Sequence, residues 1–200
     1  KNYVAWCWKA GGDPVVNTDG TVAAMVSANK EAGFSIITYT GVGPGTAANE
    51  ITLGHGLDNA PQIVIVKKRT GTSQDALFYH DLVDGSFDYG VLAATDASGN
   101  SGNTLPNSKI IHGGGSVWNI NNVEHIIYAW HSVEGYSKFG TYEGSGNADG
   151  PFVYLGFKPA WLMIKNADVG SAGYSWYMWD GKRPGFNINY ELFANDSQTE

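Results

Sequence analysis

β-branched and aromatic residues gather in short runs along this chain, and Gly, Pro, Asn and Asp residues bound the runs. Such runs are typical of β-strands. They predict strands at residues 3–9, 34–40, 62–68, 76–80, 89–94, 108–111, 124–131, 137–142, 151–155, 160–166 and 174–179. The spacing of about ten to fifteen residues predicts an all-β fold of antiparallel sandwich or jelly-roll layers. Residues 21–29 fit a short helix or a strand equally well, and no other segment suggests a helix.

The chain repeats itself at a distance of about 100 residues. Gly33–Gly41 returns as Gly135–Gly144, and Ile63–Lys67 returns as Trp161–Lys165. The distance between matching positions changes only across Gly- and Asn-rich stretches, as expected for loops on a repeated scaffold. The pattern predicts tandem β-sandwich units of the jelly-roll or concanavalin-like type.

A second similarity fixes the limits of the unit. Val4–Lys9 resembles Ile126–His131, so residues 1–10 are interpreted as the last strand of a preceding unit. Residues 11–32 are interpreted as an insertion, with a hairpin turn at Asp19-Gly20. Residues 33–131 then form a complete sandwich unit, and residues 132–200 form a second, truncated one. We therefore expect the 200 residues to be a window from a longer polypeptide.

Charge and apolar content limit the classes of partner. The net charge of −7 argues against nucleic acid, which requires clustered Lys and Arg. We interpret the basic run Lys67–Arg69 as a solvated strand end. No apolar run approaches the roughly 18 residues of a membrane span, so membrane insertion is not expected. The single cysteine, Cys7, lies in an apolar run and is interpreted as a small core residue.

Candidate catalytic chemistry is sparse in the sequence. No two of the five histidines have zinc-site spacing, and Gly-x-Ser-x-Gly does not occur. No pair of the 19 acidic residues stands in a recognisable glycosidase setting. We therefore expect a non-enzymatic protein without a cofactor.

One loop offers oxygen ligands at alternate positions, as calcium-binding loops do. The candidate ligands are Asp96, Ser98 and Asn100. However, Ser101 occupies the position where a calcium loop has Gly, and Asn107 occupies the position of its Glu. The alternative interpretation is an Asx-rich turn.

Aromatic side chains are the candidates for stacking on sugars. We expect the tryptophans inside predicted strands to be core residues: Trp6, Trp8, Trp130, Trp161, Trp176 and Trp179. Trp118 differs, because it follows the run Gly113–Ser116 and precedes an Asn-rich stretch. It is the ligand-binding candidate on an exposed loop, with burial under that loop as the alternative.

Several blocks carry a resemblance to a repeated domain of tailed-phage structural proteins, often from marine phages. These proteins are described as tail-fibre-like or as containing a SPRY or concanavalin-like sandwich. The blocks are Tyr3–Gly12, Gly33–Gly41, Gly54–Leu57, Val133–Tyr142 and Asp149–Pro159.

The resemblance implies a structural protein located in the virion, either a tail fibre or a surface appendage or decoration. It implies contacts with copies of itself or with other virion proteins, and with host-surface polysaccharide. A free carbohydrate-binding, lectin-like module is the alternative, and a polysaccharide depolymerase domain is the second alternative.

Overall fold

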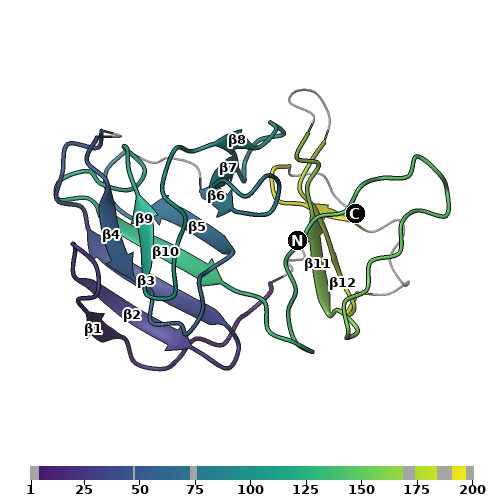
Figure 1. Cartoon of the computed structure of the whole chain (residues 1–200), viewed down its shortest axis with the longest axis horizontal. Coiled ribbons are helices and arrows are strands. Elements are labelled where there is room, and N and C mark those ends of the chain that lie inside the picture. Colours follow the sequence, from purple (N-terminus) through teal and green to yellow (C-terminus); the bar gives the residue numbers. More distant parts are fainter. Residues whose placement is uncertain (1–4, 47, 73–75, 169–173, 184–190, 197–200) are drawn as a thin grey trace.

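The computed structural model describes residues 5–46, 48–72, 76–168, 174–183 and 191–196 (Figure 1). These residues form strands, turns and loops without a helix, and the strands among them pair in antiparallel fashion. The predicted all-β antiparallel fold is therefore confirmed. Nothing in the described ranges is a helix long and apolar enough to cross a membrane.

The largest sheet has eight strands with β10 and β3 near its centre. In spatial order the strands are β1 (Val15–Asn17), β2 (Ala24–Asn29), β3 (Phe34–Thr40), β10 (Glu124–Trp130), β5 (Ile63–Lys68), β6 (Leu77–His80), β7 (Asp88–Val91) and β8 (Gly99–Asn100). β10 closes the sheet by pairing with β3 on one edge and with β5 on the other.

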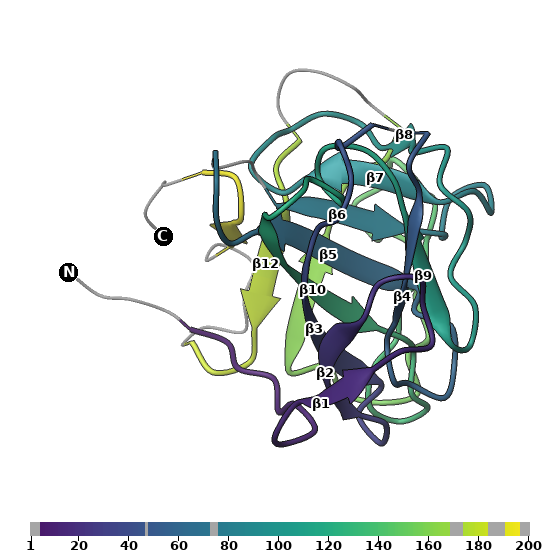
Figure 2. The same ribbon diagram turned by 90° about the vertical axis from the view of Figure 1, so that its left-hand side faces the viewer.

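A second layer covers one face of this sheet (Figure 2). It contains β4 (Ile51–Gly54) and β9 (Ile110–Gly113), which pair with each other. Side chains alternate along each strand, so every second residue points into the space between the layers. The fully buried residues include Ile37, Leu53, Val64, Val66, Ile111 and Ile127. Each such side chain stabilises the fold by about 1.5–3 kcal/mol through burial.

Residues 11–32 contribute the hairpin β1–β2 to the edge of the large sheet. The turn is stabilised by Asn17, whose Oδ1 accepts a hydrogen bond from the Asp19 N–H at 2.9 Å. Of the two interpretations of residues 21–29, the strand is the one formed, because Ala24 to Val26 pair with β1 and Met25 to Asn29 pair with β3.

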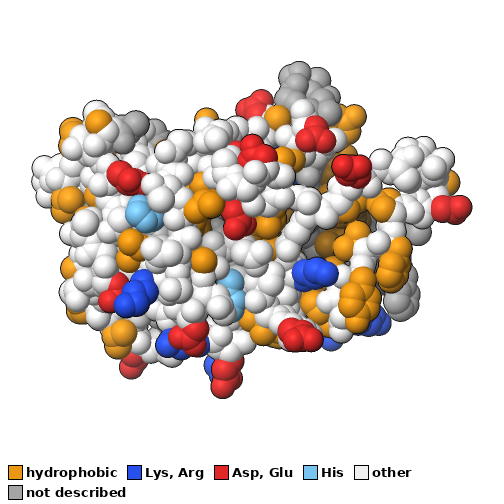
Figure 3. Space-filling model, viewed as in Figure 1, with side chains coloured by type: hydrophobic (Ala, Val, Ile, Leu, Met, Phe, Trp, Pro, Cys, Tyr) orange, Lys and Arg blue, Asp and Glu red, His pale blue; other side chains and the backbone are white. Residues whose placement is uncertain are grey.

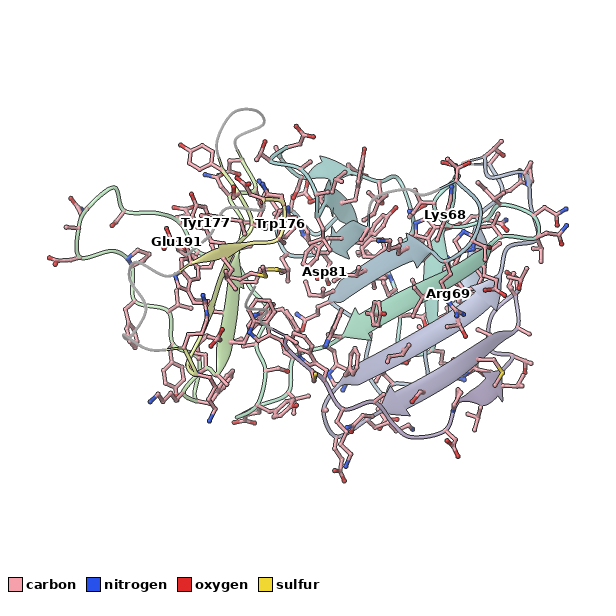
Figure 4. All side chains as sticks on the ribbon, turned by 180° about the vertical axis from the view of Figure 1, so that it is seen from behind. Lys68, Arg69, Asp81, Trp176, Tyr177 and Glu191 are labelled. Carbon is pink, nitrogen blue, oxygen red and sulfur yellow. The ribbon has the colours of Figure 1, made fainter. Side chains whose placement is uncertain are left out.

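A separate three-stranded sheet contains β11 (Trp161–Ile164), β12 (Tyr177–Asp180) and β13 (Leu192–Phe193). It packs on the other face of the large sheet, where Ile63, Phe78 and Trp176 form a second, smaller core with Met163 beside them. Figure 4 shows Trp176 on the side of this sheet near the large sheet and Tyr177 on the farther side.

Three predicted strands differ from the structure. Residues 137–142 and 151–155 are extended or irregular, and residues 5–9 of the predicted strand 3–9 are not paired as a strand. Residues 3 and 4 lie outside the described residues. A strand requires a hydrogen-bonded neighbour as well as a suitable side-chain pattern. The apolar runs predicted strands here, but the described residues do not provide such neighbours.

Candidate functional site

Trp118 is fully buried between the two layers. Its Nε1–H donates a hydrogen bond to the Tyr79 hydroxyl at 2.8 Å, and its carbonyl accepts one from the Tyr39 hydroxyl at 2.7 Å. Gly113 has no side chain, so the indole ring can lie directly against β9. The expectation of an exposed, ligand-binding Trp118 is therefore wrong, and its alternative, burial under the loop, is confirmed.

The candidate calcium ligands have protein partners. Asn100 Oδ1 accepts a hydrogen bond from the Gly102 N–H at 2.7 Å, which is the contact of an Asx turn. Ser98 Oγ lies 3.0 Å from His80 Nε2. The negative charge of Asp96 acts on Lys165, whose pKa is lowered by burial and raised in part by Asp96. These contacts fit the alternative of an Asx-rich turn, while cation binding stays a prediction.

The contact of His80 with Ser98 resembles a catalytic pair, but its hydrogen bonds do not suit one. The Leu82 N–H points at His80 Nδ1 at 3.4 Å, so the ring proton lies on Nε2 and is donated to the Ser98 hydroxyl. His55 has the same arrangement, because the Leu57 N–H donates to its Nδ1 at 3.1 Å. Burial lowers the pKa of both imidazoles. Both histidines therefore act as neutral structural residues.

The basic run at the end of β5 is only partly solvated. Lys68 lies among the buried residues, and burial lowers the pKa of its ammonium group. Arg69 forms an exposed ion pair with Glu124, with Nη1 and Oε2 3.7 Å apart. Figure 4 shows Lys68 and Arg69 at the end of the large sheet far from the three-stranded sheet. The interpretation as a solvated strand end is thus wrong for Lys68, because strand alternation turns its side chain inward.

The N-terminal segment runs between the large sheet and β11 (Figure 1) and contributes two rings to an aromatic cluster there. We call Trp6, Trp8, Trp130 and Trp161 the aromatic junction. The Trp8 ring meets Trp161 edge-on with 5.3 Å between ring centroids, and it meets Trp130 edge-on at 6.2 Å. Trp6 lies 6.2 Å from Trp161. Such edge-on pairs contribute about 0.5–1.5 kcal/mol beyond burial.

Trp8 is the exposed ring of the junction. Its side chain is 42% exposed, which contradicts the expectation of a core residue. Cys7 is also exposed, so its interpretation as a core residue is wrong. The reason is the same for both: residues 5–9 lie on the surface of the junction and not inside a sheet. No direct signal of this exposure lies in the sequence, because Val4–Lys9 resembles Ile126–His131, whose residues 126–130 belong to the paired strand β10.

Asp180 anchors the junction from β12. Its Oδ2 accepts hydrogen bonds from Trp6 Nε1 at 3.2 Å and from Arg183 Nε at 2.8 Å. Its Oδ1 accepts the backbone N–H groups of Lys182 and Arg183. Burial raises the pKa of this carboxyl, but the hydrogen bonds outweigh it and lower the pKa to about 2. The carboxylate is therefore ionised and occupied by protein donors, which suits an anchor and not a general acid.

Among the described residues, no further strand covers the apolar side chains on the far side of the three-stranded sheet. We call Leu162, Ile164, Tyr177 and Trp179 the open face; the register of β11 with β12 places them on one side. Met163 points the opposite way, into the small core. Tyr177 and Trp179 stack with 5.8 Å between ring centroids. Figure 3 shows hydrophobic side chains gathered at the surface of this part of the molecule.

The repeat shows how unusual this exposure is. The exposed fractions of residues that match in the sequence repeat can be compared, with the residue from 33–131 first in each pair. They are 0% for Val64 and 39% for Leu162, 0% for Leu53 and 43% for Val153, and 6% for Tyr39 and 49% for Tyr142. The first member of each pair is covered by the opposite layer of the sandwich. The second member meets solvent, although its chemical character is the same. The C-terminal part therefore exposes apolar residues whose sequence counterparts in residues 33–131 are buried.

Comparison with known proteins identifies the family. The whole chain, residues 1–200, matches a family described as a domain of unknown function, DUF7483. The chain belongs to this family. No curated protein and no solved structure matches it. The DUF7483 description assigns no activity, so a function for this chain has to be argued from its surface.

Proposed function

We propose that this DUF7483 chain is a non-enzymatic structural protein of a phage-type virion, either a tail fibre or a surface appendage or decoration. In this proposal residues 132–200 are a second sandwich unit of the same kind as residues 33–131. The open face of this unit packs against the open face of a second copy of the chain. The virion assignment is supported by the sequence resemblance, and the assembly by the surface.

The open face carries the proposal, because Leu162 is exposed there and Ile164, Tyr177 and Trp179 are only half-buried. Soluble proteins rarely expose contiguous apolar surface, and where they do it usually marks an interface. Leu162 is 39% exposed and lies beside the stacked rings of Tyr177 and Trp179. Two sheets that pack face to face bury such side chains about 10 Å apart. A two-fold pair of open faces would supply the missing layer with the same surface from each copy.

Strand register supports the assignment of a second unit. Ile63 lies opposite His80 in β5 and β6, and their repeat counterparts, Trp161 and Asp180, lie opposite each other in β11 and β12. A shift of one residue would turn every side chain to the other face, so equal register is a specific similarity.

Light scattering over a series of protein concentrations tests the assembly. We expect a dimer that dissociates on dilution, and we expect Leu162→Ser to raise the dissociation constant at least tenfold. Val83→Ser is the matched control, because Val83 is similarly exposed (46%) but lies in the complete unit. A monomer at every concentration, or equal effects of the two substitutions, would refute the proposed interface.

The carbohydrate-binding alternative is favoured by a different observation. Trp8 presents an exposed indole ring that is held in place by Trp130 and Trp161. A ring fixed in this way is suited to stacking on a sugar. A glycan array with the wild type and Trp8→Ala tests it: loss of a wild-type signal in the variant supports glycan contact at the junction, and an unchanged signal excludes Trp8. Product release from capsular polysaccharide tests the depolymerase alternative.

A further inference from the structure

In the part of the chain that the structure describes, β11 has one edge that is not paired with another strand. Its repeat counterpart, β5, is paired on both edges, with β6 on one side and β10 on the other. Among the described residues, β11 is paired with β12 only. Its second edge is therefore the position that β10 occupies in the complete unit. An unpaired strand edge offers a row of hydrogen-bonding groups to another strand.

The segment Ala5–Lys9 has the sequence of a β10 strand. It matches Ile127–His131, with Trp8 at the position of Trp130. In the complete unit Trp130 lies opposite Ile63 of β5, and the counterpart of Ile63 is Trp161. The Trp8 and Trp161 rings already touch at 5.3 Å. The side-chain contact expected from a β10-type pairing is thus present in this chain.

The sides on which the side chains of residues 5–9 lie also agree with a β10-type pairing to β11. Trp6 and Trp8 contact Trp161, and Trp6 also donates to Asp180. By register Trp161 and Asp180 lie on the side of the sheet that carries Met163 and faces the large sheet. Cys7 has the opposite parity and is exposed. An extended strand would place Trp6 and Trp8 on the side of Trp161, with the Trp8 ring still partly exposed, and Cys7 on the opposite side.

We propose that residues 5–9, which lie unpaired beside β11 in this structure, can move onto its free edge in the same chain and form an antiparallel strand in the register of β10. Trp8 then lies opposite Trp161, and Cys7 lies opposite Leu162, as Ala129 lies opposite Val64 in the complete unit. The added strand closes the edge of the three-stranded sheet and extends the open face by one strand. The inference rests on the sequence repeat and the junction contacts, and not on the proposed role in a virion.

A disulfide tests the register. Residues opposite each other in an antiparallel pair have Cα atoms about 4.5–5.5 Å apart, within the range of about 4.4–6.8 Å for disulfides. In Leu162→Cys at low protein concentration, we expect mild oxidation to form an intrachain bond with native Cys7. Loss of both free thiols in a product that stays monomeric on non-reducing electrophoresis would show it.

Two controls make the result specific. Met163→Cys is one residue out of register and points to the other face, so we expect its oxidation to be at least tenfold slower. Leu162→Cys in a Cys7→Ser background identifies any product that does not need Cys7. Equal oxidation of the two cysteine variants would overturn the proposed register. A disulfide between two chains that requires Cys7 would overturn the assignment to the same chain.

Discussion

Substitution of Tyr79 by Phe removes the hydroxyl that accepts the buried N–H of Trp118. The donor and acceptor are 2.8 Å apart, and both residues lie in the core of the sandwich. The substitution keeps the ring and its packing, so its main effect is to leave the indole N–H without this acceptor in an apolar interior. Such a group costs about 1–3 kcal/mol of folding free energy.

A double-mutant cycle separates the free energy of the hydrogen bond between Trp118 and Tyr79 from the free energy of packing. Trp118→Phe removes the donor together with part of the ring, and a large core truncation of this kind costs up to about 3–5 kcal/mol. Once the donor is absent, Tyr79→Phe should cost less than it does in the wild type. We expect a coupling energy of about 1 kcal/mol, within the usual range for contacting residues.

Urea unfolding followed by far-ultraviolet circular dichroism gives the four free energies. This signal does not depend on the tryptophan that is replaced. We expect the midpoint to fall in each variant while the slope of free energy against urea stays constant. Additive effects, or a Tyr79→Phe variant as stable as the wild type, would show that the Trp118 hydrogen bond does not hold the two layers together.

Three further predictions follow from the same structure. Trp8→Ala should lower the free energy of unfolding far less than Trp118→Ala, because Trp8 is 42% exposed and Trp118 is buried; urea unfolding of both variants compares them. Gly113→Ala should destabilise the fold by about 1–3 kcal/mol, because the added Cβ would overlap the Trp118 ring; thermal unfolding measures it. Burial lowers the pKa of His55, His80 and His125. The unfolded chain therefore takes up protons first as the pH falls below 6.5, so stability should decrease there, as urea midpoints at decreasing pH would show.

The strands within residues 33–131 can be predicted well from the sequence, because several of them are buried on both faces. Residues 63–66 and 126–130 are apolar on both faces, since one face meets the second layer and the other meets the C-terminal part. Only a buried strand can carry such a run. Residues 137–142 and 151–155 show similar patterns but form no strand, apart from a single bridge between Ser137 and Val133, because a sequence pattern specifies side-chain faces and not the neighbouring strand.

The candidate site was harder to predict, because exposure depends on contacts between distant segments. The glycines around Trp118 predicted a loop, yet they do not specify that the loop folds back over the core. Trp8 has the sequence context of a core strand, and its exposure arises because residues 5–9 lie apart from the unit they resemble. The open face was missed because Leu162 and Val64 look alike in sequence and differ only in what covers them.

Amide hydrogen exchange at two protein concentrations tests the central claim most directly, since it locates the interface as well as detecting it. The account predicts that exchange in β11 and β12 slows as the concentration rises, because association stabilises this sheet against local opening. The amides of β5 and β6, its counterparts in the complete unit, should exchange at the same rate at both concentrations. Exchange in β11 and β12 that does not depend on concentration, or slowing confined to β5 and β6, would contradict the claim that the open face is where copies of the chain meet.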